Sequence, residues 1–386
     1  MISDLGPYLE SRQSAMLAML EEMVLIQSGS ANKAGVDAMA RLVERTCRTL
    51  PVRIQTIEQK TLGNHLVVHT HAVDAASQRI LLVGHMDTVF PADTDFNWFR
   101  EDERHCYGPG VCDMKGGLVV GIFAMRALAA CGFLEQLPIT FVFNADEEIG
   151  SPSSGDLIRE QARQSAAAFV LECAGQDSQI VTGRKGNLSL RLEVNGRACH
   201  AAFASQDKAS ALLEIAHKTI LLEQLNDHAK GITVNVGKID GGIGANTVAE
   251  NARAWVDCRF VAPQQKQVLA TRLHDIVSAN TVSSTHSAIE TVSSRPPMPQ
   301  SAGNYSLYEI VRSVGAKLGQ TIGEEYRQGV SDANLIAAEG IPVIDGLGPV
   351  GGKDHSDNEY MLKESLIQRT LLLSNTIIAL NRHFSL

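Results

Sequence analysis

The sequence predicts an α/β protein into which a smaller α+β domain is inserted. Three observations point to this fold class. Short apolar runs such as 80–83 alternate with amphipathic segments up to about residue 172, a pattern typical of sheets covered by helices. Between about residues 183 and 296, strands of alternating polarity replace these runs, as in antiparallel sheets with one solvated face. The chain of 386 residues is also too long for one ordinary core, which favours two domains.

Composition and charge narrow the classes of partner. The formal net charge of −9 argues against a general affinity for nucleic acid or anionic membranes. The seven cysteines are scattered without Cys-x-x-Cys spacing, which indicates free thiols in a reducing compartment. The N-terminus shows no secretory signal, and no apolar run is long enough to span a bilayer. We therefore expect a soluble, cytoplasmic protein.

The first part of the chain, residues 1–182, alternates helices and strands. We expect helices at about 7–26, 35–50, 118–130 and 151–164, and strands at 52–57, 65–69, 80–84, 138–143 and 167–172. His65, His69 and His71 cluster in this part but lack partner carboxylates. We interpret them as surface or strand histidines and not as metal ligands.

His85 and Asp87 stand where the apolar run from Ile80 ends. In an extended segment, residues two apart point to the same side, so an imidazole and a carboxylate emerge together. Ligands bind at this end of the strands in open α/β sheets. The pair suits a histidine that binds a metal while a carboxylate fixes its ring. The alternative is a histidine and an aspartate in an ordinary loop.

Asp113 lies in a glycine-rich turn, Tyr107 to Gly117, ahead of the helix expected at 118–130. A carboxylate in such a place can be a simple helix cap. The glycines on both sides favour instead a close approach of the backbone to a ligand. The turn lacks the spacing of the known phosphate-binding loops, so we discount a phosphate site.

Acidic residues also follow the next two apolar strands. Asp146, Glu147 and Glu148 are consecutive, and Glu172 ends the run at 167–172. Like charges repel at a strand end, and a bound cation resolves this conflict. The whole set at strand ends is rich in oxygen and poor in nitrogen: His85, Asp87, Asp113, Glu147, Glu148 and Glu172. Zinc accepts both ligand types, and two ions can share one bridging carboxylate.

The element order changes in the inserted part and then returns. We expect strands at 187–194, 232–239, 251–260 and 288–293 with helices at 209–225 and 264–278, which is the ferredoxin-like β-α-β-β-α-β order. The α/β pattern then resumes with helices at 304–318, 332–339 and 362–381 and strands at 323–327 and 342–344. The predicted domains are therefore 1–182 with 297–386, and 183–296 between them. Taken alone, His355 is an ordinary loop residue.

Six motifs, in this order and at these separations, resemble the co-catalytic zinc aminoacylase/carboxypeptidase family. They are Gly84-His-Met-Asp-Thr-Val89, Gly108-Pro-Gly-Val-Cys-Asp-Met-Lys-Gly-Gly117, Asp146-Glu-Glu-Ile-Gly-Ser151, Glu172, Cys199-His-Ala-Ala202 and His355-Ser-Asp357. The family includes glutamate carboxypeptidases, acetylornithine deacetylase and succinyl-diaminopimelate desuccinylase. Within it, the chain is most similar to the glutamate carboxypeptidases that cleave folates. The resemblance implies a zinc-exopeptidase-like catalytic domain with a mixed central sheet.

The resemblance also implies the role of each motif residue. Five side chains would hold two Zn²⁺ ions per subunit, with Co²⁺ or Mn²⁺ as substitutes: His85, Asp113, Glu148, Glu172 and His355. His85 and Glu172 would bind one ion, Glu148 and His355 the other, and Asp113 both. Asp87 would orient His85, and Glu147 would be the general base that activates the attacking water.

In this family the inserted domain is a dimerisation lid, which implies a homodimer. His200 would stabilise the oxyanion in the partner subunit's site, the alternative being an ordinary histidine at a strand end. Asn246, Arg259 and Arg295 would bind polar groups of the substrate. Arg259 alternates with Asp257 and could instead be half of a cross-strand ion pair. Arg295 precedes two prolines, and its planar guanidinium suits a substrate carboxylate.

The leading hypothesis is a zinc-dependent exopeptidase that cleaves an amide bond to release a C-terminal amino acid, glutamate above all, from peptidyl or N-acyl (folate-like) substrates. One alternative is an N-acyl-amino-acid deacylase such as acetylornithine deacetylase or succinyl-diaminopimelate desuccinylase. A further alternative is a binding or assembly protein that keeps the fold without turnover. The retention of Glu147 and of every expected zinc ligand argues against this last one.

Overall fold

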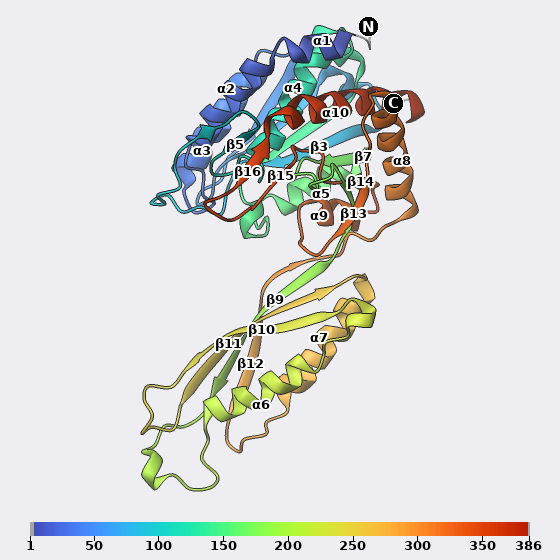
Figure 1. The fold of residues 1–386 in the computed structure, drawn as a ribbon. Helices are drawn as coiled ribbons and strands as arrows, with labels where there is room; N and C mark the ends of the chain where they lie inside the picture. Colours follow the sequence, from blue (N-terminus) through green and yellow to red (C-terminus); the bar gives the residue numbers. More distant parts are fainter. Residues whose placement is uncertain (1–3, 385–386) are drawn as a thin grey trace. The chain divides into compact units, whose positions relative to one another are not determined.

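The computed structural model describes residues 4–384, so residues 1–3 and 385–386 of the predicted catalytic domain lie outside the described residues. The chain forms two compact units (Figure 1). Unit 1 contains the described residues up to Gly183, Gln300–Arg327, and those from Ser331 onward. Unit 2 contains Arg184–Pro299 and Gln328–Val330.

Unit 1 is built on a six-stranded sheet in the order β1-β2-β6-β3-β7-β14. The strands are β1 (Val52–Ile57), β2 (His65–Thr70), β3 (Arg79–His85), β6 (Ile139–Asn144), β7 (Ser165–Val170) and β14 (Val343–Ile344). The strands β6, β3, β7 and β14 run parallel, whereas β1 and β2 are antiparallel to their neighbours. The predicted α/β class with a mixed central sheet is therefore confirmed.

Helices cover both faces of this sheet (Figure 1). They are α1 (Leu5–Glu10), α2 (Gln13–Val24), α3 (Lys33–Cys47), α4 (Lys115–Ala130), α5 (Gly155–Arg163), α8 (Ala302–Lys317), α9 (Ala333–Ala338) and α10 (Lys363–Phe384). The helix α4 packs on α10 and on β3, while α5 packs on α9 and β7 across the sheet. In the described part of the chain, no helix is both long and apolar enough to cross a membrane.

Several element predictions for unit 1 need correction. The helix predicted at 7–26 is two helices, because the Ser11 hydroxyl donates to the Tyr8 carbonyl and competes with the helical ladder. The short strands β4 (Arg100–Glu101), β5 (His105–Tyr107), β15 (Gly351–Gly352) and β16 (Tyr360–Leu362) form a second sheet that we did not predict. The strand β8 (Ile180–Arg184), which pairs with β13 (Glu324–Arg327), was also missed. Such short strands carry too few residues for a period to show.

The strand histidines of β2 are buried and not on the surface. His65 Nε2 lies 3.0 Å from the Ser153 hydroxyl, and His69 Nδ1 lies 2.9 Å from the Thr140 hydroxyl. Burial lowers the pKa of both imidazoles. They are neutral polar groups of the sheet, on the strand where the sequence places them.

Unit 2 contains the four-stranded antiparallel sheet β10-β11-β9-β12 with two helices on one face (Figure 1). Its elements in chain order are β9 (Gly186–Asn195), α6 (Ala211–Glu223), β10 (Thr233–Gly241), β11 (Asn251–Phe260), α7 (Pro263–Ser278) and β12 (His286–Arg295). The β-α-β-β-α-β order is the one that the sequence predicts. Apolar side chains alternate along β9, with Leu188, Leu190 and Leu192 in the core of the unit.

Candidate metal centre and active site

The ends of three neighbouring parallel strands bring the predicted ligands of unit 1 together. His85 is the last residue of β3, Glu147 and Glu148 follow β6, and Glu172 follows β7. Because the carboxyl ends of parallel strands meet at one edge of a sheet, these side chains converge there. Their burial is nearly complete at His85 and Glu172, which are 1% and 7% exposed.

The His85 ring is held by its own loop. Its Nδ1 atom lies 3.0 Å from the Asp87 carbonyl oxygen and 3.4 Å from the Asp87 carboxylate. The backbone oxygen is therefore the nearer partner, and it requires the proton on Nδ1. The other nitrogen, Nε2, lies 3.1 Å from Asp113 Oδ1 and 3.6 Å from Glu172 Oε1.

The Asp87 carboxylate lies near His85 and also stabilises the turn that contains Glu147 and Glu148. It accepts the Ser30 hydroxyl at 2.6 Å and the backbone N–H groups of Glu147 and Glu148 at 3.2 Å each. Those two acids lie in a short 3-10 turn and not in an extended strand end. The turn, which Asp87 stabilises, is what separates their side chains.

Asp113 stands between two groups of side chains. Its Oδ1 atom lies 3.1 Å from His85 Nε2, and its Oδ2 atom lies 3.2 Å from His355 Nε2. His355 Nε2 also lies 3.3 Å from Glu148 Oε2. The two carboxylate oxygens of Asp113 thus face two different histidines, each of which has a second carboxylate beside it.

The turn that carries Asp113 is shaped by a residue that the sequence analysis missed. The Glu359 carboxylate accepts the backbone N–H groups of Gly110, Cys112 and Asp113 at 2.8 to 2.9 Å. Glu359 is distant from this turn in sequence, and no local pattern could pair them. Its position four residues after His355, in the same glycine-rich loop, was the one available signal.

The glycines near Asp113 serve packing more than ligand approach, which corrects our expectation. A Cβ atom at Gly117 would lie 1.9 Å from the Leu171 carbonyl oxygen. Glycine therefore lets α4 pack against the segment that leads to Glu172. The conformation of the turn does need glycine at Gly110, whose φ is +78°.

The three consecutive acids do not share one site, which corrects a second expectation. The Asp146 carboxylate is buried and accepts the backbone N–H and hydroxyl groups of Ser153 and Ser154, so its role is structural. Glu147 instead lies at the centre, with a carboxylate oxygen within 4.8 Å of ligand atoms of His85 and Glu172.

The charges at this centre shift one another's pKa values. Burial and the nearby Asp113 charge raise the pKa of Glu172 to about 7. Burial also raises the pKa of Glu148. Hydrogen bonds to Asp113 and Glu148 raise the pKa of His355 to about 11. Perturbed pKa values of this kind, caused by burial and by neighbouring ionisable groups, are common at functional sites.

A cavity of about 480 Å³ opens beside Glu148. Its walls include the apolar side chains of Val89, Phe90, Pro91 and Ile149. Val89 and Ile149 are 38% and 49% exposed, which is unusual for large apolar residues. This cavity can accept an apolar or aromatic group next to the candidate metal centre.

The four other predicted site residues belong to unit 2. His200 and Asn246 are neighbours there, because the Ala201 N–H donates to the Asn246 carbonyl at 2.8 Å. His200 Nδ1 accepts the Ala202 N–H at 3.2 Å. Arg259 pairs at 2.7 Å with Asp257, which lies on the same strand β11, and not across strands as the alternative interpretation expected.

Arg259 and Arg295 flank one asparagine in the sheet of unit 2. Arg259 on β11 and Arg295 on β12 are both in register with Asn187 on β9, so the three residues form a row on one face. Arg295 is 2% exposed. Lys185 lies nearby, and burial together with the Arg259 charge lowers its pKa. The row concentrates buried and half-buried cations, which suits an anionic ligand.

Comparison with known proteins agrees with this geometry. Residues 81–379 match Peptidase family M20/M25/M40. The chain belongs to this family. The chain is 28% identical to carboxypeptidase G2 from Pseudomonas sp. (strain RS-16), and the alignment covers 95% of this chain and 89% of that one. As a member of this peptidase family, the chain is a metallopeptidase, a hydrolase of the carboxypeptidase type.

Solved structures from the family share the fold of this M20 chain. The M20 metallo-carboxypeptidase Sso-CP2 from Sulfolobus solfataricus superposes with a TM-score of 0.72 at 18% identity, over 94% of this chain and 98% of that one. The aminopeptidase PepT from Bacillus cereus gives a TM-score of 0.75 at 21% identity, over 95% and 98%. Enzymes of the M20 family depend on metal ions, usually zinc, and the described residues contain candidate ligand groups for them.

Proposed function

We propose that this chain is a dinuclear zinc hydrolase that releases a C-terminal amino acid, chiefly glutamate, from peptidyl or N-acyl substrates such as folate-type conjugates. The arrangement around Asp113 is the observation that carries the proposal. Its two oxygens face two separate histidines, and each histidine has its own carboxylate, Glu172 or Glu148. Such an arrangement suits two cations that share one bridging ligand.

The side chains present suit zinc. His85 and Glu172 would hold one ion, His355 and Glu148 the other, and Asp113 both. Imidazole nitrogen and carboxylate oxygen are ligands that zinc accepts, and burial and the Asp113 charge, which raise the pKa of Glu172, are the conditions under which a bound cation would favour the carboxylate. When bound, two zinc ions lower the pKa of a water molecule and polarise the carbonyl of the scissile amide.

Glu147 is the residue suited to move the proton. Its carboxylate lies within 4.8 Å of ligand atoms of His85 and Glu172, so it is close to the centre. Its backbone N–H is held by Asp87. In the proposed reaction Glu147 takes a proton from the attacking water and returns it to the nitrogen of the leaving amino acid.

The arginine row of unit 2 supports glutamate as the released residue. Glutamate carries two carboxylates, and Arg259 and Arg295 supply planar guanidinium groups on either side of Asn187. Asn246 would contribute a further polar contact to the substrate. In unit 1, the apolar cavity beside Glu148 supports a substrate that carries a bulky acyl or aryl group.

Unit 2 also carries features that suit a dimer. Large apolar side chains are exposed on α6 and near the edge strand β10, among them Leu213, Ile220 and Ile243. His200 accepts a backbone N–H at Nδ1, so its neutral ring carries the proton on Nε2. That tautomer can donate a hydrogen bond to an oxyanion, which is the role proposed for His200 in the partner subunit.

Hydrolysis of a matched substrate panel by the zinc-loaded enzyme tests this function. The panel contains folate-type and N-acyl conjugates that end in Glu, Asp, Ala or Lys, together with N-acetylornithine. We expect the highest kcat/KM for terminal glutamate, and a loss of about tenfold or more in Arg295→Ala, mainly in KM. Arg253→Ala is the matched control, since Arg253 is an exposed arginine of the same sheet that pairs with Glu193.

Preference for N-acetylornithine or a succinylated amino acid would move the chain to the N-acyl-amino-acid deacylases, which cleave the same type of bond. The absence of turnover with every substrate, in protein that holds zinc, would overturn the proposed activity.

The dimer has its own test. His200→Ala mixed with Glu147→Ala should regain activity in heterodimers, because one site then has both residues intact, and verified heterodimers without recovery would place His200 outside the partner's reaction.

A further inference from the structure

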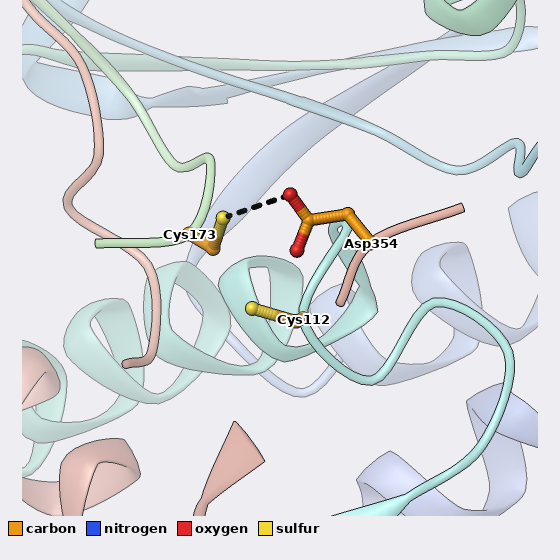
Figure 2. A group of neighbouring side chains, drawn as sticks. All are labelled: Cys112, Cys173 and Asp354. Atoms are coloured by element: carbon orange, nitrogen blue, oxygen red, sulfur yellow. Dashed lines mark hydrogen bonds between the residues drawn. The ribbon is translucent and has the colours of Figure 1, made fainter. Parts of the chain in front are cut away.

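Two thiols and a carboxylate meet behind the candidate metal centre in unit 1. One ligand atom each of Cys112, Cys173 and Asp354 lies within 4.8 Å of the others (Figure 2). Cys173 Sγ lies 4.0 Å from Asp354 Oδ2. None of the three residues belongs to the ligand set proposed for zinc. Among residues 4–384, this is the one candidate ligand group that contains sulfur.

Each member of this group is the sequence neighbour of a proposed zinc ligand. Cys112 precedes Asp113, Cys173 follows Glu172, and Asp354 precedes His355. In each pair, the proposed zinc ligand takes part in the cluster around Asp113. Its neighbour points instead toward the other two members of the set Cys112, Cys173 and Asp354 (Figure 2). The same three loops therefore present two different sets of donor atoms.

The two thiols of this cluster are shielded from solvent, and polar side chains surround them. Cys112 is fully buried and Cys173 is 7% exposed, while Asp354 lies at the surface. The Arg327 guanidinium lies 3.9 Å from Cys173 Sγ, and it is itself paired with Glu325 at 2.6 Å. The positive charge of Arg327 is thus already compensated.

We propose that Cys112, Cys173 and Asp354 form a separate binding site for one thiophilic divalent cation, such as Zn²⁺ or Cd²⁺. Thiolate sulfur and carboxylate oxygen are both ligands of these ions, and three protein ligands with a water in the fourth position complete a tetrahedral site. Binding releases the two thiol protons to solvent, so two thiolates and one carboxylate face the dication.

The site links the three loops that hold the active-site ligands. A cation bound by Cys112, Cys173 and Asp354 fixes the backbone next to Asp113, Glu172 and His355, as groups around metal ligands do in other sites. His355 gains most from this, because its own side chain is 56% exposed and its backbone φ is +60°. The inference concerns a different ligand set from the proposed dinuclear centre and is testable without turnover.

Cadmium titration of the full chain, with thiols kept reduced by a phosphine, measures this site directly. Cadmium bound to thiolate gives an ultraviolet charge-transfer band, whereas a centre made of nitrogen and oxygen ligands gives none. We expect the band of the unmodified chain to saturate at one thiolate-bound cadmium per chain, and Cys112→Ser and Cys173→Ser to abolish it. Asp354→Asn, a change at the surface, should weaken cadmium binding about tenfold or more.

Cys199→Ser is the matched control. Cys199 is exposed, and it belongs to none of the candidate metal-binding groups among the described residues. Its band should equal that of the unmodified chain. A band that survives in Cys112→Ser, or unchanged affinity in Asp354→Asn, would overturn the proposal. So would reduced protein that binds no cadmium but forms a Cys112–Cys173 disulfide with peroxide, releasing two water molecules, since the pair would then be a redox pair. Loss of hydrolysis with the band intact would count against the dinuclear centre only.

Discussion

Both units bury charged side chains, but they do so in opposite ways. In unit 2, Lys218 and Glu214 are fully buried and lie 3.0 Å apart. Lys218 also donates to the carbonyls of Ile276, Val277 and Ala279, and Glu214 accepts the N–H groups of Thr281 and Val282. Both charges of this pair therefore have partners of the opposite polarity.

The centre of unit 1 has no such balance. Three carboxylates, on Asp113, Glu148 and Glu172, share two histidines, and the pKa of Glu172 rises to about 7 because burial and the Asp113 charge oppose its ionisation. A satisfied buried pair indicates structure, whereas a buried excess of one charge indicates a ligand. The following predictions test this distinction.

The largest effect is expected for Glu147→Gln in unit 1. Removal of the proposed base should lower kcat about 10²- to 10⁴-fold, while the zinc ligands stay in place. The measurement is steady-state hydrolysis together with the zinc content of the purified variant. Near-normal kcat at full zinc content would show that another group moves the proton.

In unit 2, removing one partner of the Lys218–Glu214 pair should lower the stability and leave the activity unchanged. Lys218→Met leaves Glu214 buried without its cation, so the free energy of unfolding should fall by about 3–5 kcal/mol. Urea unfolding measures the loss, and kcat of the folded protein should be unchanged. The double variant Lys218→Met with Glu214→Leu should recover much of the stability, because replacing both buried charges is often neutral. A single variant as stable as the double would mean that the pair contributes little.

Zinc removal should affect the stability of unit 1 through its excess charge. Ions that bind only the folded chain stabilise it by about 2.7 kcal/mol when their free concentration is 100 times Kd. We therefore expect a chelator to lower the melting temperature, and zinc to restore it. In His355→Ala the gain from added zinc should shrink. An unchanged melting temperature after verified zinc removal would contradict the proposed centre.

The sequence could predict the parts of unit 1 that depend on local pattern. The apolar runs of β3 and β6 predict buried strands, and the residues at their ends, His85 and Glu147, are brought together as expected. Contacts between distant segments were beyond reach. Glu359 accepts a hydrogen bond from the turn that carries Asp113, and Asp146 accepts one from the Ser153 N–H. Neither hydrogen bond produces a periodic pattern in the sequence.

In unit 2, the sequence likewise predicts the local elements but not the contacts between strands. Alternating polarity predicts its strands and their order, because one face of each strand packs on the core. The row of Arg259, Asn187 and Arg295 depends on strand register, which the pattern of a single strand does not fix. Its role in binding a substrate carboxylate stays a prediction.

The smallest effect concerns a buried group that avoids charge altogether. Burial and the nearby Arg79 and Arg53 charges lower the pKa of His69 from 6.5 to about 4. Between these values the unfolded chain binds a proton that the folded chain does not, so the stability from His69 is complete above about pH 6.5 and is lost as the pH falls toward 4. After allowance for solvent screening, the loss is on the order of 1 kcal/mol.

Thermal unfolding of wild type and His69→Gln between pH 7 and pH 5 measures this loss. The variant should lose less stability on acidification than the wild type, since it has no imidazole to protonate, whereas its stability at pH 7 depends only on how well the amide replaces the contact with Thr140. His71→Gln, at an exposed position in the next turn, should keep the wild-type slope. Equal slopes in all three proteins would mean that His69 stays neutral or charged in both states, and that burial in β2 does not control its protonation.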